Sequence, residues 1–566
     1  MASPVSVVIA FDFGTTYSGI SYAFRKPGQQ ANPSPISKWP GDAGRVSNDV
    51  KVPTIISYNP ADISDFKWGY QVKLGDKAIV GIKLLLDPDQ KKPSCLPGSG
   101  KRTALKTLPK PAVDIAADYI GAVYEYAVKE IRKGSVGRFF DTCEREFVLT
   151  VPAVWSDKAK DLTLQAATKA GLGTVTMIKE PEAAAIYTLS EQTLGLQKDD
   201  IYVICDAGGG TVDLITYEVA QAYPLELAEV VPGSGGMAGA IGLNKRFEDS
   251  VRDLIGEVQM AALKSTPDGW VYVLDQFETG IKRKFSDDSF DEPYYVHFLG
   301  LRLEDDPSEN LEHNDWSMKW GDLHEIFDPL VEDVIRLIDE QVQSSRKKHP
   351  FHPIKAIFLV GGFGSNSYLK TRIEKHFRDV QVIQPANAAS AIMNGAVMYR
   401  LANGPKIVSR QATCHYGVKA WDSLTTLEDA SKPAWLNPHT GETRVEQMEW
   451  HITIGQELNE EKIKLNFFRT FDHPYSPEQL EVEDHLYFSK AKSPPRYPDC
   501  PEVMKCCRLK TSLYPARHLM RKTQVGANNR PYWKITYDLV VTAKANLHFS
   551  LEINGKEYSS VEASYE

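Results

Sequence analysis

Two short segments of the chain carry residues that together could bind a phosphate group and a metal ion. Asp12-Phe13-Gly14-Thr15-Thr16 recurs 194 residues later as Asp206-Ala207-Gly208-Gly209-Gly210-Thr211. Glycine leaves the backbone open to close approach, so the N–H groups and threonine hydroxyls of such a turn can converge on phosphate oxygens. An aspartate would repel phosphate, so a divalent cation or its bound waters must lie between them, and magnesium is the natural choice.

The residues around each segment predict the element that presents it. Each aspartate ends an apolar run, at residues 7–11 or 201–205, and a second apolar run follows the turn at residues 18–22 or 212–217. Two buried strands joined by a glycine-rich tip form a hairpin. A single Gly-Gly turn often does no more than reverse a strand, but two copies at the spacing of a domain favour a phosphate clamp.

A third glycine-rich segment stands between a predicted strand and a predicted helix. The apolar residues 354–360 precede Gly361-Gly362-Phe363-Gly364, and Leu369, Ile373 and Phe377 then recur every four residues, which is typical of a helix. Glycine at the start of a helix lets an anionic ligand approach the backbone. The same turn also occurs where a helix packs tightly on a strand, and the residues alone leave both interpretations open.

Length, composition and charge exclude several classes of protein. A chain of 566 residues, 42% hydrophobic and 25% charged, predicts a soluble folded protein of about three or four structural units. Its formal net charge of −9 argues against nucleic acid as a partner. No apolar run reaches the ~20 residues of a membrane span and no secretory signal opens the chain, so we expect no membrane association. Seven cysteines without a framework spacing indicate reduced thiols and a cytoplasmic location, with the nucleus left open.

Two further patterns resemble known sites but have the wrong residues or spacing. Gly98-Ser99-Gly100-Lys101-Arg102 looks like part of a P-loop. Cys95 stands where that loop needs a glycine, and its arginine stands where a hydroxyl residue is needed. The three cysteines between residues 500 and 507 include no C-x-x-C pair, so they do not predict a zinc site.

The three glycine-rich turns, in this order, resemble those of the ATPase domain of the seventy-kilodalton heat-shock chaperone family, within the actin-like ATPase superfamily. Thr150-Val151-Pro152-Ala153-Val154-Trp155-Ser156 is similar to the family's crossover strand, and Lys179-Glu180-Pro181-Glu182 is similar to the start of the next helix. The match covers roughly the first 400 residues. It implies an α/β fold with a duplicated actin-like ATPase domain, whose two ribonuclease H-like lobes bind ATP or ADP and Mg²⁺.

Helix signals accompany these segments. Ser156 is a suitable N-cap and Gly171 a suitable stop for a helix between them, and Pro181 suits the first turn of the next helix because its missing N–H costs nothing there. Apolar residues from Leu323 to Val342 recur on one face, as expected of a long helix.

The resemblance also implies roles for individual residues. Asp12 and Asp206 would hold hydrated magnesium, and the catalytic set would be Lys83, Glu180, Asp206 and Thr211, with Glu180 near the attacking water. The implied nucleotide-binding residues are Gly14, Thr15, Thr16, Tyr17, Gly208, Gly209, Gly210, Thr211, Gly235, Gly236, Lys282, Ser286, Gly361, Gly362, Phe363 and Gly364. Outside the resemblance, a lone lysine is usually solvated surface, and a glutamate at a helix start is a favourable charge there.

Several positions depart from the family's pattern around the adenosine. Phe363 replaces a polar residue, Ser365 replaces a ring-stacking arginine, and Thr279 replaces an acidic residue. Asn387 lies near a further position where the family has an acidic residue. The choice of base is therefore left open by the sequence.

The last third of the chain changes character. Apolar residues alternate with polar ones from Trp533 to Leu539, and Asn554-Gly555 is a two-residue hairpin turn. Typical family members end in a helical lid, for which no pattern appears here. We expect residues 1–400 to form the nucleotide-binding domain and residues 401–566 to form a small antiparallel β domain that binds a substrate or partner, as in a divergent member with a shortened C-terminal half.

Three functions remain in competition. The first is a slow, chaperone-like ATPase that couples its nucleotide state to binding of a peptide or protein client, with co-chaperones allowed as partners. The second is a nucleotide-binding scaffold or sensor with little or no hydrolysis. The third is a small-molecule kinase, because sugar kinases share the actin-like lobes, although no motif for a substrate-side base is present.

Overall fold

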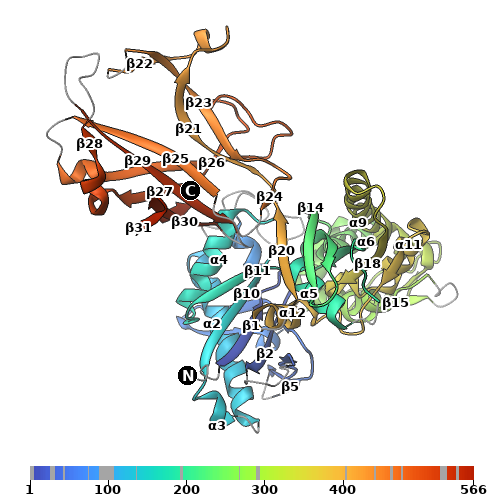
Figure 1. Cartoon of the computed structure of the whole chain (residues 1–566). Helices are drawn as coiled ribbons and strands as arrows, with labels where there is room; N and C mark the ends of the chain where they lie inside the picture. Colours follow the sequence, from blue (N-terminus) through green and yellow to red (C-terminus); the bar gives the residue numbers. More distant parts are fainter. Residues whose placement is uncertain are drawn as a thin grey trace. The chain divides into compact units, whose positions relative to one another are not determined.

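The computed structural model describes residues 6–25, 32–42, 45–73, 76–87, 108–134, 137–191, 195–266, 268–287, 293–401, 405–438, 441–458, 463–472, 476–522, 532–543 and 547–565. The chain forms two compact units (Figure 1). Unit 1 comprises Met1–Trp155 and Leu162–Ile407, and unit 2 comprises Ser156–Asp161 and Val408–Glu566. The P-loop-like segment 98–102 and Cys95 lie outside the described residues.

The first sheet of unit 1 is built around β1 (Ser6–Asp12), in which every residue is buried. β1 pairs antiparallel with β2 (Tyr17–Arg25) and parallel with β10 (Glu144–Val151), and β10 pairs parallel with β11 (Val175–Lys179). Asp12 lies opposite Gly19, so residues 13–16 belong to the turn between the two strands of the hairpin. A strand covered on both faces must be apolar throughout, which explains the continuous run at residues 7–11.

The second sheet of unit 1 is built in the same way around β12 (Ile201–Ala207), which is also wholly buried. β12 pairs antiparallel with β13 (Val212–Gln221) and parallel with β18 (Ile354–Val360), and β18 pairs parallel with β19 (Gln381–Ile383). β14 (Glu226–Gly236) continues the sheet beside β13.

The two sheets therefore share one strand order. It runs β11-β10-β1-β2 in the first and β19-β18-β12-β13 in the second, with the hairpin on one side and the parallel strands on the other. The repeat predicted from the sequence is a repeat of topology, and it brings Asp12 and Asp206 to equivalent strand ends. The expected mixed α/β character is confirmed.

Two helices pack against residues of both sheets in one hydrophobic cluster. These helices are α5 (Glu180–Glu191), which follows β11, and α12 (Ala391–Arg400), which follows β19. They approach closely because their facing residues are small: a Cβ on Gly395 of α12 would overlap the carbonyl oxygen of Ala183 in α5. This close packing links the two sheets.

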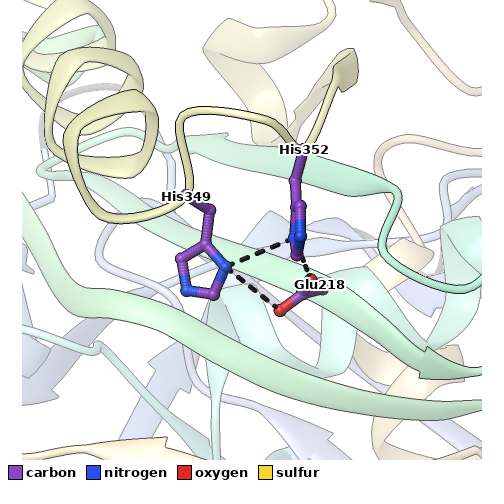
Figure 2. A group of neighbouring side chains, drawn as sticks. All are labelled: Glu218, His349 and His352. Carbon is purple, nitrogen blue, oxygen red and sulfur yellow. Dashed lines mark hydrogen bonds and ion pairs between the residues drawn. The ribbon is translucent and has the colours of Figure 1, made fainter.

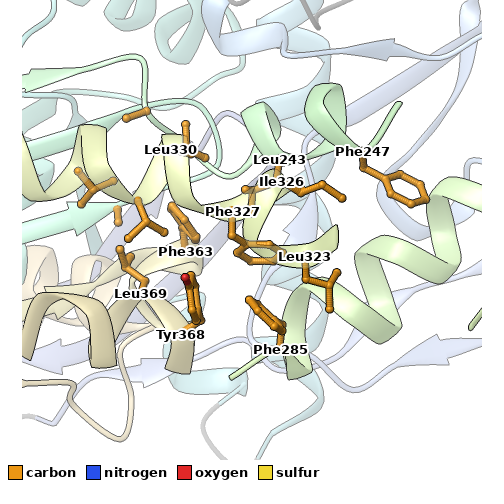
Figure 3. Packing of buried hydrophobic residues seen from close by; sticks show 14 of the residues in the cluster. Leu243, Phe247, Phe285, Leu323, Ile326, Phe327, Leu330, Phe363, Tyr368 and Leu369 are labelled. Carbon is orange, nitrogen blue, oxygen red and sulfur yellow. The ribbon is translucent and has the colours of Figure 1, made fainter. Parts of the chain in front are cut away.

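A second cluster fills the space between β12, β13, β18 and the helices α6 (Ile241–Ser265), α9 (Trp320–Lys348) and α11 (Ser367–His376). Figure 3 shows Phe327 of α9 beside Tyr368 of α11 and Phe363 of the short helix α10 (Gly361–Gly364). The stripe from Leu323 to Val342 is buried in α9, as predicted. The cluster thus fixes the third glycine-rich turn against the second sheet.

The remaining elements of unit 1 cover these sheets or form small sheets of their own. The helices are α2 (Ala112–Lys133), α3 (Gly137–Phe140), α4 (Asp157–Lys169), which begins in unit 2, α7 (Gly269–Asp275) and α8 (Lys282–Lys284). The strands are β3 (Ser34–Pro35), β4 (Trp39–Pro40), β5 (Val46–Ser47), β6 (Val52–Pro53), β7 (Ile55–Asn59), β8 (Asp62–Trp68), β9 (Ile79–Val80), β15 (Tyr294–His297), β16 (Leu311–Glu312) and β17 (Asp315–Met318).

Several predicted helix signals are confirmed. The Ser156 hydroxyl accepts a hydrogen bond from the Ala159 N–H at the start of α4, and Gly171 has a φ of 83° just after that helix ends. Pro181 lies in the first turn of α5. None of the helices among the described residues is long and apolar enough to cross a membrane.

Apart from the first turn of α4 and the strands β20 (Lys406–Gln411) and β24 (Glu457–Leu458), unit 2 is built mainly from two antiparallel sheets with a common core. One has the order β22 (Ala434–Leu436), β23 (Thr443–Ile452), β21 (His415–Ser423), β26 (Glu481–Ser489), β27 (Met504–Ser512) and β32 (Glu562–Tyr565). The other has the order β25 (Ile463–Asp472), β29 (Tyr532–Ala543), β30 (Leu547–Ile553) and β31 (Lys556–Ser560), with β28 (Arg521–Lys522) beside β29. Asn554 and Gly555, with φ values of 52° and 76°, join β30 to β31 as the sequence predicts. The strands β20 and β24 pair with each other.

Candidate functional site

The two glycine-threonine turns of unit 1 touch each other. A Cβ on Gly209 would overlap the Thr16 side chain, and a Cβ on Gly210 would lie 2.8 Å from Thr15 Cγ2. Any larger side chain at these glycines would push the turns apart. Glycine is therefore required here by the close approach of the first turn to the second.

The turns line one cavity of ≈ 390 Å³. Its walls include sixteen of the predicted site residues: Asp12, Gly14, Thr15, Thr16, Tyr17, Lys83, Glu180, Asp206, Gly208, Gly209, Gly210, Thr211, Lys282, Gly361, Gly362 and Phe363. Segments far apart in the sequence thus meet around one space. A cavity of this size is within the range of about 300–1,000 Å³ that small-molecule ligands occupy.

Four of the predicted nucleotide-binding residues do not belong to the cavity wall, which is formed without Gly235, Gly236, Ser286 and Gly364. Gly235 pairs with Asp213 across β14 and β13, and a Cβ there would overlap the Val212 carbonyl. The Gly364 carbonyl accepts a hydrogen bond from the Gln384 side chain. Gly235 therefore has a packing reason to be small, whereas a Cβ on Gly364 would come no closer than 3.4 Å to another atom.

Asp206 carries a carboxylate oxygen for which the fold provides no donor. Its Oδ1 atom is buried and has no hydrogen-bond partner among the described residues. Burial, reinforced by the Glu180 and Asp213 carboxylates and opposed by Lys51, raises the pKa of Asp206 well above its usual range. An unpartnered buried carboxylate is costly, so a cation at this position would stabilise its ionised form.

Asp12, by contrast, has partners on both oxygens. The Thr150 hydroxyl donates to its Oδ1 at 3.0 Å, and Lys51 Nζ lies 2.8 Å from its Oδ2. Burial acts to lower the pKa of Lys51, but Asp12, with Asp206 and Glu180, outweighs it and raises that pKa. Lys51 lines the cavity and was missed by the sequence analysis, because a single lysine between valines carries no recognisable pattern.

Lys83 and Glu180 form a buried ion pair in the cavity wall. Their residues are only 2% and 6% exposed, so the interpretation of Lys83 as solvated surface is wrong. Lys83 Nζ also lies 5.3 Å from the centre of the Trp155 ring. Burial, together with Asp12 and Asp213 and against the effect of Lys83, raises the pKa of Glu180 to about 7. A carboxyl group with that pKa can exchange a proton near neutral pH.

These groups form one acidic cluster of Asp12, Glu180, Asp206 and Asp213, with Lys51 and Lys83 as its cations. The Asp213 carboxylate accepts a hydrogen bond from the Val154 N–H at 3.3 Å, yet burial raises its pKa as well. Four carboxylates against two lysines leave an excess of two negative charges when all are ionised. A divalent cation matches that excess.

The third turn meets the second through Gly361. Its φ is +84°, and a Cβ there would overlap Asp206 Oδ1 and lie 2.5 Å from the Ala207 carbonyl oxygen. Gly361 therefore combines a left-handed backbone with close packing on the second aspartate. The neighbouring Phe363 is 3% exposed and its ring belongs to the hydrophobic cluster around Phe327 and Tyr368 (Figure 3).

A shift of one residue explains why Thr279 stands where the family pattern has an acidic residue. Gln276–Ile281 forms a π-helical turn, whose wider winding changes which residues face the cavity. Glu278 lines the cavity there, and it accepts a hydrogen bond from the Asn244 side chain at 2.6 Å. Asn244 in turn accepts one from Lys282 at 2.9 Å. An acidic residue is thus present beside Lys282 after all, one position earlier than the family pattern suggests.

The arrangement can bind a polyanion next to a divalent cation. Residues of both glycine-rich turns line one cavity with the cationic Lys51, Lys83 and Lys282, and so does Asp206, whose Oδ1 atom has no partner among the described residues. Phosphoryl transfer depends mainly on such positioning and charge neutralisation.

The amino-acid sequence is similar to those of several known proteins. Residues 197–384 match a family model described as a domain of unknown function (DUF8340). The chain is 26% identical to heat shock 70 kDa protein 12A of Mus musculus, over 90% of this chain and 86% of that protein. It is 25% identical to heat shock 70 kDa protein 12B of Homo sapiens, over 90% and 84%. Chaperone protein DnaK of Anaplasma marginale is 37% identical over 105 residues, which are 18% of this chain. The first two similarities extend into the last third of the sequence.

Proposed function

Because the chain is a divergent member of the seventy-kilodalton heat-shock protein family, we propose that it binds ATP or ADP with Mg²⁺ in the cavity of unit 1 and hydrolyses ATP slowly. The observation that carries this proposal is the contact between residues 13–16 and 208–211, each turn following a buried strand that contains an aspartate. Donors that meet from two sides suit a polyphosphate better than a single anion.

The acidic cluster supports a magnesium ion as part of the ligand. Asp206 would hold it, directly or through water, because its Oδ1 atom is buried without a partner. Asp12 would contribute through water, since both of its oxygens already have contacts. Magnesium keeps several of its waters and is usually bound by one or two carboxylates together with phosphate oxygens. When bound, it would neutralise phosphate charge.

The chain's own residues supply the remaining chemistry. The N–H groups of Gly209 and Gly210 and the hydroxyls of Thr15, Thr16 and Thr211 would hold the phosphates, because the Gly208 N–H already donates to the Thr211 carbonyl at 2.9 Å. Lys83, oriented by its ion pair, would place positive charge near the transferred group. Glu180, whose pKa burial raises to about 7, would orient the attacking water and accept its proton at the carboxylate.

One observation favours the sensor as a second candidate. Lys51 Nζ lies 2.8 Å from Asp12 Oδ2, so a fixed ammonium group already neutralises one of the two aspartates. A site with this built-in cation could bind nucleotide with less dependence on Mg²⁺ than a site whose two aspartates are both unpaired. Hydrolysis would then be slow or absent.

A single-turnover assay with radiolabelled ATP separates these functions. We expect hydrolysis by the wild type in Mg²⁺, and a rate at least about 100-fold lower in Asp206→Asn, by analogy with the loss of one electrostatic group from other active sites. The matched control is Asp379→Asn, which changes an exposed aspartate paired with Arg346. Tight ATP binding without hydrolysis in the wild type would favour the sensor, and phosphorylation of an added sugar or polyol would favour the kinase.

We also propose that residues 1–400 form the two-lobed actin-like domain and that residues 401–566 bind peptide or protein clients. Strand β22 supports the second part: it ends its sheet, and its residues Ala434, Trp435 and Leu436 are exposed. The Trp435 ring lies 5.5 Å from that of Trp421, which is also exposed. An edge strand flanked by apolar side chains suits an extended apolar peptide that adds a strand.

Fluorescence anisotropy with a labelled extended apolar peptide tests the client site. We expect binding that weakens in Trp435→Ala and is unchanged in Tyr223→Ala, a substitution of an exposed aromatic residue in unit 1. Coupling to the nucleotide predicts that ATP alters protease cleavage between residues 400 and 415. Identical cleavage with and without ATP would contradict the proposed coupling but not the proposed nucleotide binding.

We propose a cytoplasmic location, with the nucleus as the alternative. The described cysteines are all free, among them the buried Cys205, Cys414, Cys506 and Cys507, which suits a reducing compartment. Fluorescence microscopy of the tagged full chain tests the location, and secretion of the chain would contradict it.

A further inference from the structure

Three side chains with metal-binding atoms converge at one end of the second sheet. Figure 2 shows Glu218 of β13 facing His349, which caps the C-terminus of α9, and His352, which lies in the turn before β18. His352 Nδ1 contacts Glu218 Oε1, and His349 Nδ1 lies 3.7 Å from Glu218 Oε2. The two Nδ1 atoms are 3.3 Å apart. One ligand atom of each residue lies within 4.8 Å of the other two.

The separation of the two nitrogens suits a shared metal ion. Zinc binds imidazole nitrogen at ~2.0–2.1 Å in tetrahedral geometry, which places two such ligands about 3.3–3.4 Å apart. Without an ion, the two close Nδ1 atoms depend on the tautomers that the rings adopt and on the Glu218 carboxylate as their acceptor. A single divalent cation would satisfy both nitrogens and the carboxylate together.

The backbone holds the two histidines in place. The N–H of His349 donates to the Ser345 carbonyl at 2.9 Å, and the N–H of His352 donates to the His349 carbonyl at 3.2 Å. The carbonyl of Pro353 then accepts from the Ile201 N–H at 3.0 Å, which fixes the turn to β12. Preorganised ligands lower the cost of binding.

We propose that Glu218, His349 and His352 form a binding site for one divalent transition-metal ion of the zinc class, with the fourth position open to solvent or a further ligand. Imidazole nitrogens select zinc, copper or nickel over magnesium, which prefers oxygen ligands. The three side chains are 15%, 27% and 33% exposed, so an ion can reach them. The bound ion would fasten the end of α9 to β13.

This site is separate from the nucleotide cavity. Glu218 pairs with Ile201 at the start of β12, whereas Asp206 lies near the end of that strand. Five residues of strand span about 17 Å. Zinc binding here therefore does not depend on the proposed ATPase function, and either can fail without the other.

Equilibrium dialysis of the chelator-treated full chain against zinc, followed by elemental analysis, tests the site. We expect one equivalent in the wild type, and an affinity more than about 100-fold lower in His349→Ala and His352→Ala, because loss of a direct ligand exceeds the effect of outer-sphere changes. His376→Ala removes an exposed histidine elsewhere and should bind like the wild type. Cobalt(II) should give visible bands without the thiolate charge-transfer band.

The isosteric Glu218→Gln variant tests whether a loss of zinc affinity could come from a loss of folding. It keeps the shape of the side chain and removes the charge, so its metal-free melting curve should stay close to that of the wild type while its zinc affinity falls. Unchanged zinc affinity in this variant, or a cobalt spectrum with thiolate ligation, would overturn the proposal.

Discussion

Replacing Gly361 by alanine should displace the Asp206 carboxylate while leaving that side chain itself unchanged. Gly361 has a φ of +84°, and a Cβ there would overlap Asp206 Oδ1 and lie 2.5 Å from the Ala207 carbonyl oxygen. The next residue, Gly362, provides the matched control, because a Cβ on it would meet no atom within 4 Å. Both glycines line the cavity.

The expected cost follows from these two contacts. A left-handed conformation costs a residue with a Cβ about 1–2 kcal/mol, and overpacking of a tight site costs about 1–3 kcal/mol more. Gly361→Ala should therefore lower the free energy of unfolding by about 2–5 kcal/mol, whereas Gly362→Ala should stay within about 0.5 kcal/mol of the wild type. The displaced Asp206 carboxylate should also weaken magnesium-dependent binding of nucleotide.

Urea unfolding of the full chain and calorimetry with Mg-ATP measure both effects. A Gly362→Ala variant that keeps its stability but loses ATP affinity would indicate that nucleotide occupies the open space next to that residue. Equal stability and equal ATP affinity in the Gly361 and Gly362 variants would refute the assigned packing of the third turn on Asp206.

Three further substitutions or conditions test the remaining contacts. Lys51→Met leaves the buried Asp12 carboxylate without its cation and should cost about 3–5 kcal/mol in unfolding experiments. The folded pKa of Glu180, raised from 4.5 to about 7, means that the folded state binds the proton more tightly. In a pH series without magnesium, the free energy of unfolding should therefore fall as the pH rises from 4.5 to about 7. Added magnesium should offset this loss. Asp429→Asn should lower the melting temperature, because its buried carboxylate accepts from the Thr425 and Thr426 N–H groups and from Tyr497, whereas the exposed Asp499→Asn should not.

The strands and turns of the site could be predicted from the sequence because their causes are local. A fully buried strand must read as an apolar run, and a turn that touches another backbone must be glycine, so the segments ending in Asp12 and Asp206 are visible without a structure. The hairpin at Asn554 and Gly555 is equally local, since its backbone needs positive φ values. Such features depend on few neighbours.

The residues that sequence reasoning missed depend on contacts between distant segments. Lys51 reaches Asp12 only because β6 pairs with β2 beside the first turn. Glu278 takes the place expected at Thr279 because a π-helical turn changes the register, and no residue pattern reveals that turn. Glu218 lies 131 residues before His349, so only the His-x-x-His spacing could have drawn attention to the cluster.

The acidic cluster is hard to explain by stability alone. Asp206 and Asp213 are 4% and 1% exposed, and burial raises the pKa of each, so both destabilise the folded chain when ionised. Well-packed apolar residues in place of buried ionic groups are often neutral or stabilising by about 1–4 kcal/mol. The cost is instead reasonable if a bound cation offsets it, because a ligand that binds only the folded state adds to stability in proportion to the logarithm of its concentration. The energetic centre of the site therefore lies at Asp206, whose Oδ1 atom the fold leaves without a donor among the described residues.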